Sequence, residues 1–383
     1  MINIFNQLDY NDDYSVEKWN QLTKDIFLKY FTSEDIYLRN KEILRSELVN
    51  YMTIYYNNHY IKLLNDIHLI FSDSIQKNQK ESFELLLNNF EKVSNTDDRY
   101  LSYFISQPDV TDFTKKDFAV YYFKSIDEII EGCYNPRFKL FYQFYKFNKN
   151  NIFEDIKNKS LGNLVTDKEF ENFDLLIKDP IFNIHINQWR NIASHKDYKV
   201  SKNNIEIRYG TKKDKIKTIT HDELKKITFW IRDIYASLRL AEVLIHLNYM
   251  EDIMSLDEFK NINIEQRSEA TLLHIIHNLQ IVGFKFESFY ENNTTFELNL
   301  FIKNNNDIKE SIIHSSQMFS PLACALNDDE FQKDKFTDIK INILNDKKET
   351  LASATVDIKS CLDFSNHKLS QKELIYKINF CIT

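Results

Sequence analysis

One stretch decides the fold class: THDELKKITFWIRDIYASLRLAEVLIHLNYM, from Thr220 to Met250. Thr220 and Glu223 have the spacing of a capping box, in which each side chain bonds to the other residue's backbone amide at a helix start. Apolar residues then recur at steps of three and four, as on the buried face of a helix: Leu224, Ile227, Ile231, Ile234, Leu238, Ala241 and Ile245. The stretch predicts one long helix that packs lengthwise in a bundle or across a dimer.

The composition of the whole chain also favours helices. Only four Gly and four Pro interrupt its 383 residues, which is too few breaks for a turn-rich all-β fold. Helical spacing predicts helices across 16–95 and 99–150, with a break at Asn95–Asp98. One aromatic run in the second segment is best interpreted as core: Phe138, Phe141, Tyr142, Phe144, Tyr145 and Phe147. We therefore predict a mainly α protein.

The pattern changes toward the C-terminus. Apolar and polar residues alternate there in three runs, 296–302, 339–343 and 374–382, with the period of half-buried antiparallel strands. Residues 351–358 offer another strand, and 266–277 a helix. The length suggests more than one domain. We predict an N-terminal helical region (1–98), a helical domain (99–255) and a smaller C-terminal α+β domain (260–383) with an antiparallel sheet.

A shorter helix and a β-hairpin precede the long helix. Asp179-Pro180 offers an N-cap and a first-turn proline, so a helix is expected from there towards His195. Alternating runs at 205–209 and 215–219 flank Gly210 and predict the hairpin. From Arg190 to Lys217, nine basic and three acidic residues give a net charge of +6, although the whole chain has −8. This stretch is either a solvated loop and hairpin or a track for phosphates.

The residues Arg190-Asn191-Ile192-Ala193-Ser194-His195 carry the clearest signal of chemistry. An imidazole transfers protons near neutral pH, and a guanidinium holds a phosphate and the charge that develops on it. Arg190 and His195 lie about 140° apart around a helix, whereas Asn191 and His195 share a face. A structural interpretation is also open, with a solvent-facing Arg and a His that interacts with the helix end.

This motif resembles the signature of the HEPN superfamily of ribonucleases and nucleotide-binding domains. That signature is an Arg with a polar residue directly after it and a His a few residues on, as in Arg190, Asn191 and His195. Two other Arg–His pairs of similar spacing lack the polar follower: Arg239–His246 and Arg267–His274. The resemblance ends near Tyr249 and implies a HEPN-like helical bundle, here with the inserted β-hairpin.

The resemblance implies a metal-independent endoribonuclease that acts as a homodimer, because family members pair two motifs in one composite cleft. His195 would act as general base or acid at the ribose 2′-OH or the leaving oxygen. Arg190 would hold the scissile phosphate, and Asn191 would orient His195 or the backbone. The need for a 2′-OH makes RNA, not DNA, the expected substrate. We predict RNA contacts from residues that follow the motif: Lys196, Tyr198, Lys199, Lys202, Arg208, Lys212 and Lys213.

HEPN proteins with extra domains resemble toxins and abortive-infection proteins of antiviral defence. By analogy, this chain would be a defence effector whose C-terminal domain senses a trigger or binds a regulatory partner. Two alternatives stay open. One is a non-catalytic HEPN module that binds nucleotide or RNA, and the other is a protein-interaction scaffold.

We expect no metal, no other cofactor and no membrane segment. His274 and His277 are three residues apart, but no Cys or carboxylate pair completes a metal site. No apolar stretch approaches the ~18 residues of a membrane helix, and Met1–Val16 is polar, without a secretory segment. The four cysteines form no C-x-x-C pair, as expected for reduced thiols in a cytoplasmic protein.

Overall fold

The computed structural model describes residues 16–105, 113–156, 158–210, 213–261, 271–272, 275–276, 278–279, 283–302, 307–328 and 334–382. The chain divides into two compact units. Residues 30–37 and 47–264 form one, called the helical unit below. Residues 1–29, 38–46 and 265–383 form the other, which contains the C-terminal sheet. The three-domain division drawn from the sequence stays a prediction.

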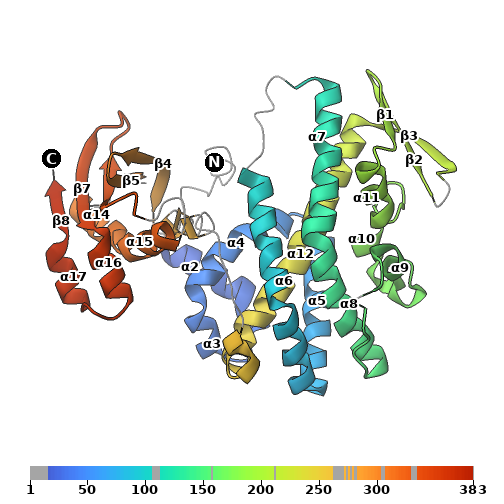
Figure 1. Ribbon diagram of the computed structural model, residues 1–383, viewed down its shortest axis with the longest axis horizontal. Helices are drawn as coiled ribbons and strands as arrows, with labels where there is room; N and C mark the ends of the chain where they lie inside the picture. Colours follow the sequence, from blue (N-terminus) through green and yellow to red (C-terminus); the bar gives the residue numbers. More distant parts are fainter. Residues whose placement is uncertain are drawn as a thin grey trace. The chain divides into compact units, whose positions relative to one another are not determined.

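Long helices form the body of the helical unit (Figure 1). They are α4 (Lys41–Tyr55), α5 (Asn58–Lys77), α6 (Gln79–Ile105), α7 (Lys115–Glu128), α8 (Asn135–Asn150) and α12 (His221–Met254). The chain also has these shorter helices: α2 (Val16–Phe27), η1 (Leu28–Tyr30), α3 (Glu34–Arg39), α9 (Leu161–Val165), η3 (Lys168–Phe173), α10 (Asp174–Ile177), α11 (Ile186–Ser194) and η4 (Asp257–Asn261). Helix α2 belongs to the other unit, and η1, α3 and α4 cross the boundary between the two units. A π-helical segment, η2 (Ile129–Tyr134), joins α7 to α8. The expectation of a mainly helical protein is confirmed.

The long helix predicted from Thr220 onward is α12. Its capping box is present, with Thr220 Oγ1 accepting from the Glu223 amide at 3.1 Å and the Glu223 carboxylate accepting from the Thr220 amide at 2.7 Å. The whole predicted apolar stripe is buried, and α12 packs against α5 and α7. The helix therefore lies lengthwise in the bundle.

The predicted aromatic run of α8 is core, as expected. All six of its rings are buried and pack against aromatic residues of other elements. Phe144 lies 4.7 Å from Phe71 of α5, and Tyr145 lies 4.7 Å from Phe170 of η3, measured between ring centroids. Offset and edge-to-face pairs of this kind add stability beyond the area that they bury.

The break predicted at Asn95–Asp98 is wrong, because α6 runs through it without interruption. Thr96 Oγ1 accepts a hydrogen bond from Arg137 Nε at 2.8 Å, and the Asp97 carboxylate lies 2.9 Å from the same guanidinium. Thr96 and Asp97, whose polarity suggested a loop in the sequence, therefore bind the buried Arg137 guanidinium inside the bundle. Buried polar groups need such partners.

The predicted hairpin is confirmed and has an additional strand. Antiparallel strands β1 (Tyr198–Val200), β2 (Asn204–Tyr209) and β3 (Lys215–Thr220) form one sheet.

The predicted helix start at Asp179-Pro180 is wrong, because the Asp179 carboxylate instead caps a turn. It accepts bonds from the amides of Ile181 and Ile184 and from the Trp189 indole, and α11 begins only at Ile186.

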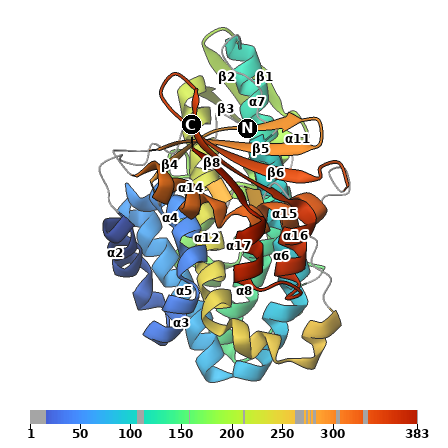
Figure 2. The same ribbon diagram turned by 90° about the vertical axis from the view of Figure 1, so that its left-hand side faces the viewer.

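The C-terminal sheet has five strands in the order β4-β5-β6-β7-β8. Figure 2 labels β4, β5, β6 and β8 of this sheet. They are β4 (Phe284–Asn292), β5 (Thr295–Ile302), β6 (Asp338–Leu344), β7 (Thr350–Asp357) and β8 (Asn379–Ile382). The predicted strands at 296–302, 339–343 and 351–358 are confirmed. The expectation of an antiparallel sheet holds for three of the four strand pairings, and the sheet is mixed because β5 and β6 pair in parallel. The helix expected at 266–277 lies largely outside the described residues.

Helices cover one face of this sheet. Alternate residues of β5 and β7 are buried under α14 (Ile308–Ser316), α15 (Phe319–Asp328) and α16 (Ile358–Ser365). The strand predicted at 374–382 is wrong in its first half, which is helix α17 (Gln371–Lys377). A capping box between Ser370 and Glu373 starts that helix, and only the last four residues pair with β7.

Among the described residues, no helix is long and apolar enough to cross a membrane. The four cysteines are free thiols. Cys133 and Cys361 are buried, Cys324 is partly exposed and Cys381 is exposed.

Candidate functional site

The motif lies at the C-terminal end of α11, a helix of nine residues. Trp189 and Ile192 face the core and are buried, whereas Arg190 and Asn191 are only partly buried. His195 is the C-cap, and its backbone amide donates to the Asn191 carbonyl at 3.0 Å. The imidazole is exposed. Helix α11 packs against α7 and η2, so the motif faces these two elements.

Arg190 is held by two side chains. Its Nε donates to the Glu131 carboxylate, and its Nη1 donates to Asn191 Oδ1 at 3.0 Å. The guanidinium is half-buried, with 35% of the side chain exposed. Glu131 belongs to the π-helical segment η2, a type of distortion that is frequent at functional sites. The cation is therefore fixed in place and partly neutralised, but solvent still reaches it.

Two polar stripes, each with a spacing of four residues, face each other here. One follows α7, η2 and α8, and the other follows α11 and its C-cap: Asp127, Glu131, Asn135 and Lys139, opposite Asn187, Asn191 and His195. The stripes run in opposite directions, because Asn187 and Asn135 line the same pocket while the charge of His195 acts on Asp127. Sequence reasoning missed the first stripe, although its four-residue spacing was a detectable signal.

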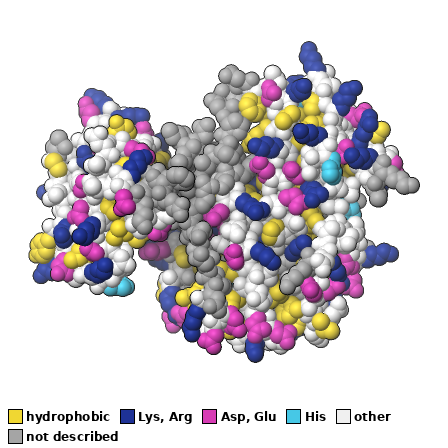
Figure 3. Space-filling view, viewed as in Figure 1, with side chains coloured by type: hydrophobic (Ala, Val, Ile, Leu, Met, Phe, Trp, Pro, Cys, Tyr) yellow, Lys and Arg dark blue, Asp and Glu magenta, His cyan; other side chains and the backbone are white. Residues whose placement is uncertain are grey.

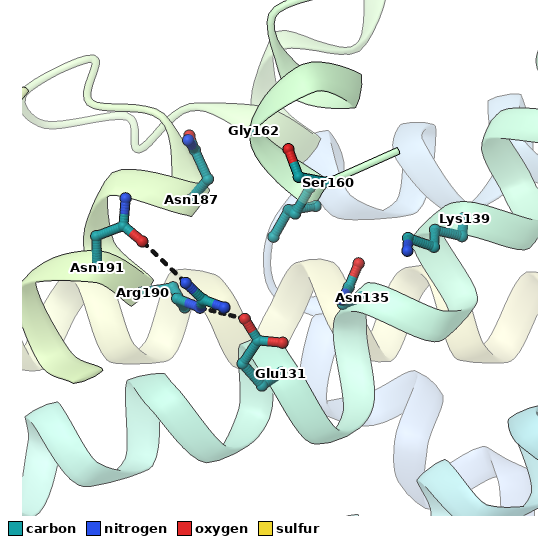
Figure 4. A pocket seen from close by; sticks show the side chains of 9 residues that line it. Glu131, Asn135, Lys139, Ser160, Gly162, Asn187, Arg190 and Asn191 are labelled. Atoms are coloured by element: carbon teal, nitrogen blue, oxygen red, sulfur yellow. Dashed lines mark hydrogen bonds and ion pairs between the residues drawn. The ribbon is translucent and has the colours of Figure 1, made fainter. Parts of the chain in front are cut away.

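A polar pocket of about 390 Å³ opens between these stripes (Figure 4). Its lining comes from η2, α8, α11 and the start of α9: Glu131, Asn135, Lys139, Ser160, Leu161, Gly162, Asn187, Arg190 and Asn191. Figure 4 shows Arg190 at one side of this space, bridged to Glu131 and Asn191, with Asn135 and Lys139 on the other helix. Two of the three predicted catalytic residues, Arg190 and Asn191, thus line a pocket.

His195 does not line that pocket, although it lies near the same acidic residues. Burial raises the pKa of Asp127, and the Glu131 and Glu128 carboxylates act in the same direction. The charges of Arg190 and His195 oppose this shift. Asp127 Oδ1 is buried and has no hydrogen-bond partner in the described part of the chain. The cation and the imidazole of the motif therefore act on one carboxyl group.

The predicted RNA-contacting residues differ in their surroundings. Lys196, Lys199 and Lys202 are exposed, and Lys196 adopts a left-handed conformation (φ 55°) just after α11. Lys213 pairs with Asp197 at 2.8 Å and Arg208 with Glu206 at 3.1 Å. Lys212 lies outside the described residues. Figure 3 shows Lys and Arg side chains gathered over the end of the helical unit that carries the three-stranded sheet.

Tyr198 has a structural contact that the sequence did not suggest. Its ring stacks on the buried Phe123 of α7, with centroids 3.9 Å apart and an interplanar angle of 13°. Burial also raises the pKa of its hydroxyl. One face of the Tyr198 ring is thus occupied by the protein, and the stack attaches β1 to α7.

The other Arg–His pair that the structure describes, Arg239–His246, does not form a comparable site. Arg239 is part of a largely buried network with Glu47 and Asp97, at 2.6 and 2.7 Å, and His246 is buried near Glu242. The pair Arg267–His274 lies outside the described residues, as does His277. Among described residues, no cluster of three or more His, Cys, Asp or Glu has the geometry of a metal site.

In comparisons with known proteins, no family model, curated protein or solved structure matches this chain.

Proposed function

We propose that this chain is a metal-independent endoribonuclease of the HEPN type, with a composite site formed by two copies. The observation that carries the proposal is the position of Arg190. It lines an open polar pocket from the same short helix that ends at His195. By contrast Arg137, whose guanidinium serves the fold, is enclosed in the core.

The side chains allow a simple division of roles. His195 is exposed and takes the proton from the ribose 2′-OH, or gives one to the leaving 5′-oxygen. Arg190 binds the scissile phosphate and stabilises the charge of the transition state. A phosphate that enters this site competes with Glu131 for the guanidinium, so RNA binding exchanges one anionic partner of Arg190 for another. Asn191 orients the guanidinium through its 3.0 Å bond.

Basic residues near the motif support an RNA path. Lys196, Lys199 and Lys202 are exposed directly after α11, where they can follow neighbouring phosphates. We extend the proposal to the cell by analogy alone. A nuclease with an additional α+β unit fits a cytoplasmic toxin or antiviral defence effector of the abortive-infection type, whose C-terminal unit receives a trigger or partner.

The test uses the full-length chain, a mixed-sequence RNA and EDTA in the assay. We expect the wild-type chain to cut RNA but not DNA, and Arg190→Ala or His195→Ala to lower the rate at least about a hundredfold. His59→Ala, an exposed histidine on α5, is the control and should cut normally. Thermal unfolding confirms that each variant folds. Cleavage that survives both motif substitutions would falsify the proposal.

One observation favours a second candidate, a non-catalytic module that binds RNA or nucleotide. Arg190 is paired with Glu131, and His195 lies outside the pocket that Arg190 lines. The same assay separates the two functions. Tight RNA binding without any product supports the binding module.

A further inference from the structure

The pocket beside the motif has more hydrogen-bonding groups than Arg190 alone explains. Asn135 Oδ1 and Asn187 Oδ1 are both buried, and neither has a hydrogen-bond partner among the described residues. A buried acceptor without a donor is costly. The last torsion of an Asn side chain is soft, so a small rotation brings either oxygen onto a donor that enters the pocket. These two amides are therefore suited to a ligand that carries hydroxyl or N–H groups.

The pocket also offers positive charge. Lys139 projects from α8 towards the pocket (Figure 4) and makes no ion pair within the described ranges. Arg190 lies across the pocket from it. Glu131 offsets only one of these two cations. An anionic group next to Lys139 is therefore favoured.

The absence of aromatic rings from this lining limits the class of ligand. Leu161 is the apolar side chain among the lining residues, and the others are polar, charged or Gly. Nucleobases are usually held by stacking on aromatic side chains, so this lining is poorly suited to a base. A sugar with hydroxyl donors and an attached phosphate suits both the amides and the lysine. The volume of about 390 Å³ is within the range for small-molecule sites.

From these features we infer that the pocket binds one ribose-phosphate unit of the RNA strand, next to the phosphate held by Arg190. The ribose 2′-OH donates to the amide oxygen of Asn187 or Asn135, and the phosphate of that unit contacts Lys139. The pocket therefore distinguishes RNA from DNA during binding, independently of the chemical need for a 2′-OH. This inference rests on the proposed nuclease function for the identity of the strand.

Gly162 supports the assignment of Asn187 to this site. A Cβ at Gly162 would lie 3.0 Å from Asn187 Nδ2, so the glycine leaves room for that amide at the pocket wall. Gly162 lies within α9, where alanine is a better helix former than glycine. Gly162→Ala is therefore a way to displace the Asn187 amide without weakening the helix.

Binding can be measured without cleavage in a His195→Ala background of the full-length chain. The probes are short fluorescein-labelled single strands of RNA and DNA with the same sequence, and the readout is anisotropy. We expect tighter binding of RNA than of DNA. Asn187→Ala should narrow that preference about three- to tenfold, the effect of one hydrogen bond. Gly162→Ala should also narrow the preference for RNA over DNA. Asn163 is an exposed amide on the same helix, so Asn163→Ala should leave that preference unchanged.

A substitution of Lys139 is expected to affect binding differently from a substitution of Asn187. Lys139→Gln should weaken RNA and DNA binding alike and reduce the slope of log K against log salt by about 0.7, the value for one phosphate contact on a single strand. Lys124→Gln is the matched control, because that exposed lysine pairs with Glu128 on α7. Circular dichroism and thermal unfolding check that all variants are folded.

The outcomes separate this inference from the nuclease proposal. If the wild-type chain cuts RNA but the Asn187, Gly162 and Lys139 variants bind like their parent, the ribose-phosphate site is refuted and the nuclease stands. If the wild-type chain cuts nothing but those variants lose RNA preference or affinity, the site stands and the nuclease fails. Equal binding of RNA and DNA by the parent also overturns the inferred site.

Discussion

Arg137 shows at the scale of one residue how the helices depend on buried charge. Its guanidinium is 1% exposed and bridges Glu242 at 2.5 Å and Asp97 at 2.9 Å. In Arg137→Met both carboxylates lose this cation, and an uncompensated charge in an interior costs about 3–5 kcal/mol. We expect the free energy of unfolding in urea to fall by about that amount.

The exposed pair of Arg208 with Glu206 provides the control for this prediction. Arg208→Met should change the free energy of unfolding by less than about 1 kcal/mol, as is typical of surface pairs. Equal effects of the two substitutions would mean that the bundle does not depend on the Arg137 bridge.

His246 makes the stability of the helical unit depend on pH. Burial lowers the pKa of this imidazole, against the influence of the nearby Glu242 carboxylate, and the charge of Arg137 adds to the lowering. The unfolded chain takes up a proton near the ordinary value of about 6.5, whereas the folded chain resists it. Stability should therefore fall as the pH drops through that value.

Replacing His246 by Gln removes this titration. We expect the decrease in melting temperature from about pH 7 to pH 5 to be smaller in His246→Gln than in the wild-type chain, whereas His59→Gln on the surface of α5 leaves it unchanged. A His246→Gln variant with the wild-type pH dependence would show that other groups cause the decrease.

At the scale of elements, the stack of Tyr198 on Phe123 fixes how the three-stranded sheet attaches to α7. The ring, not the hydroxyl, makes this contact. Tyr198→Phe should therefore keep both stability and RNA affinity. Tyr198→Ala should lower the free energy of unfolding by about 1–3 kcal/mol through lost burial and stacking. Chemical denaturation and RNA anisotropy check both effects. Loss of RNA affinity in Tyr198→Phe would instead assign the hydroxyl a contact with RNA.

Elements with a strong local signal could be predicted from the sequence. The capping box at Thr220, the apolar stripe behind it and the alternating runs around Gly210 each depend on neighbours within a few residues. Predictions failed where a distant partner or a competing local bond decides. Asp179 caps a turn because Trp189 and Ile184 donate to it. The alternation of apolar and polar residues along β5 and β6 does not reveal that these two strands pair in parallel.

The candidate site was predictable in part. The motif identified Arg190, Asn191 and His195, but not the residues opposite them. Glu131 and Asn135 lie in a segment dominated by apolar and aromatic side chains, where the aromatic core is the more prominent pattern. Their spacing of four continues through a π-helical segment, which a sequence pattern does not reveal. Pairing between two helices is a tertiary property, so only the structure brings Glu131 to Arg190.

At the scale of the whole molecule, the proposed composite site makes activity a property of two copies. A symmetric dimer brings two guanidinium and two imidazole groups to one cleft. If one Arg190 and one His195 from different copies suffice, two inactive variants complement each other. A mixed dimer of Arg190→Ala with His195→Ala retains one intact residue of each kind, contributed by different chains.

Each variant alone should be inactive, and the mixture should regain activity after the subunits are exchanged. Random pairing makes roughly half of the dimers mixed, so up to about half of the wild-type rate is expected. Size-exclusion chromatography with light scattering verifies the dimer. The control is Arg190→Ala alone, taken through the same subunit-exchange procedure. A mixture that stays inactive while it forms dimers would mean that one Arg190 and one His195 from different chains are not enough for cleavage.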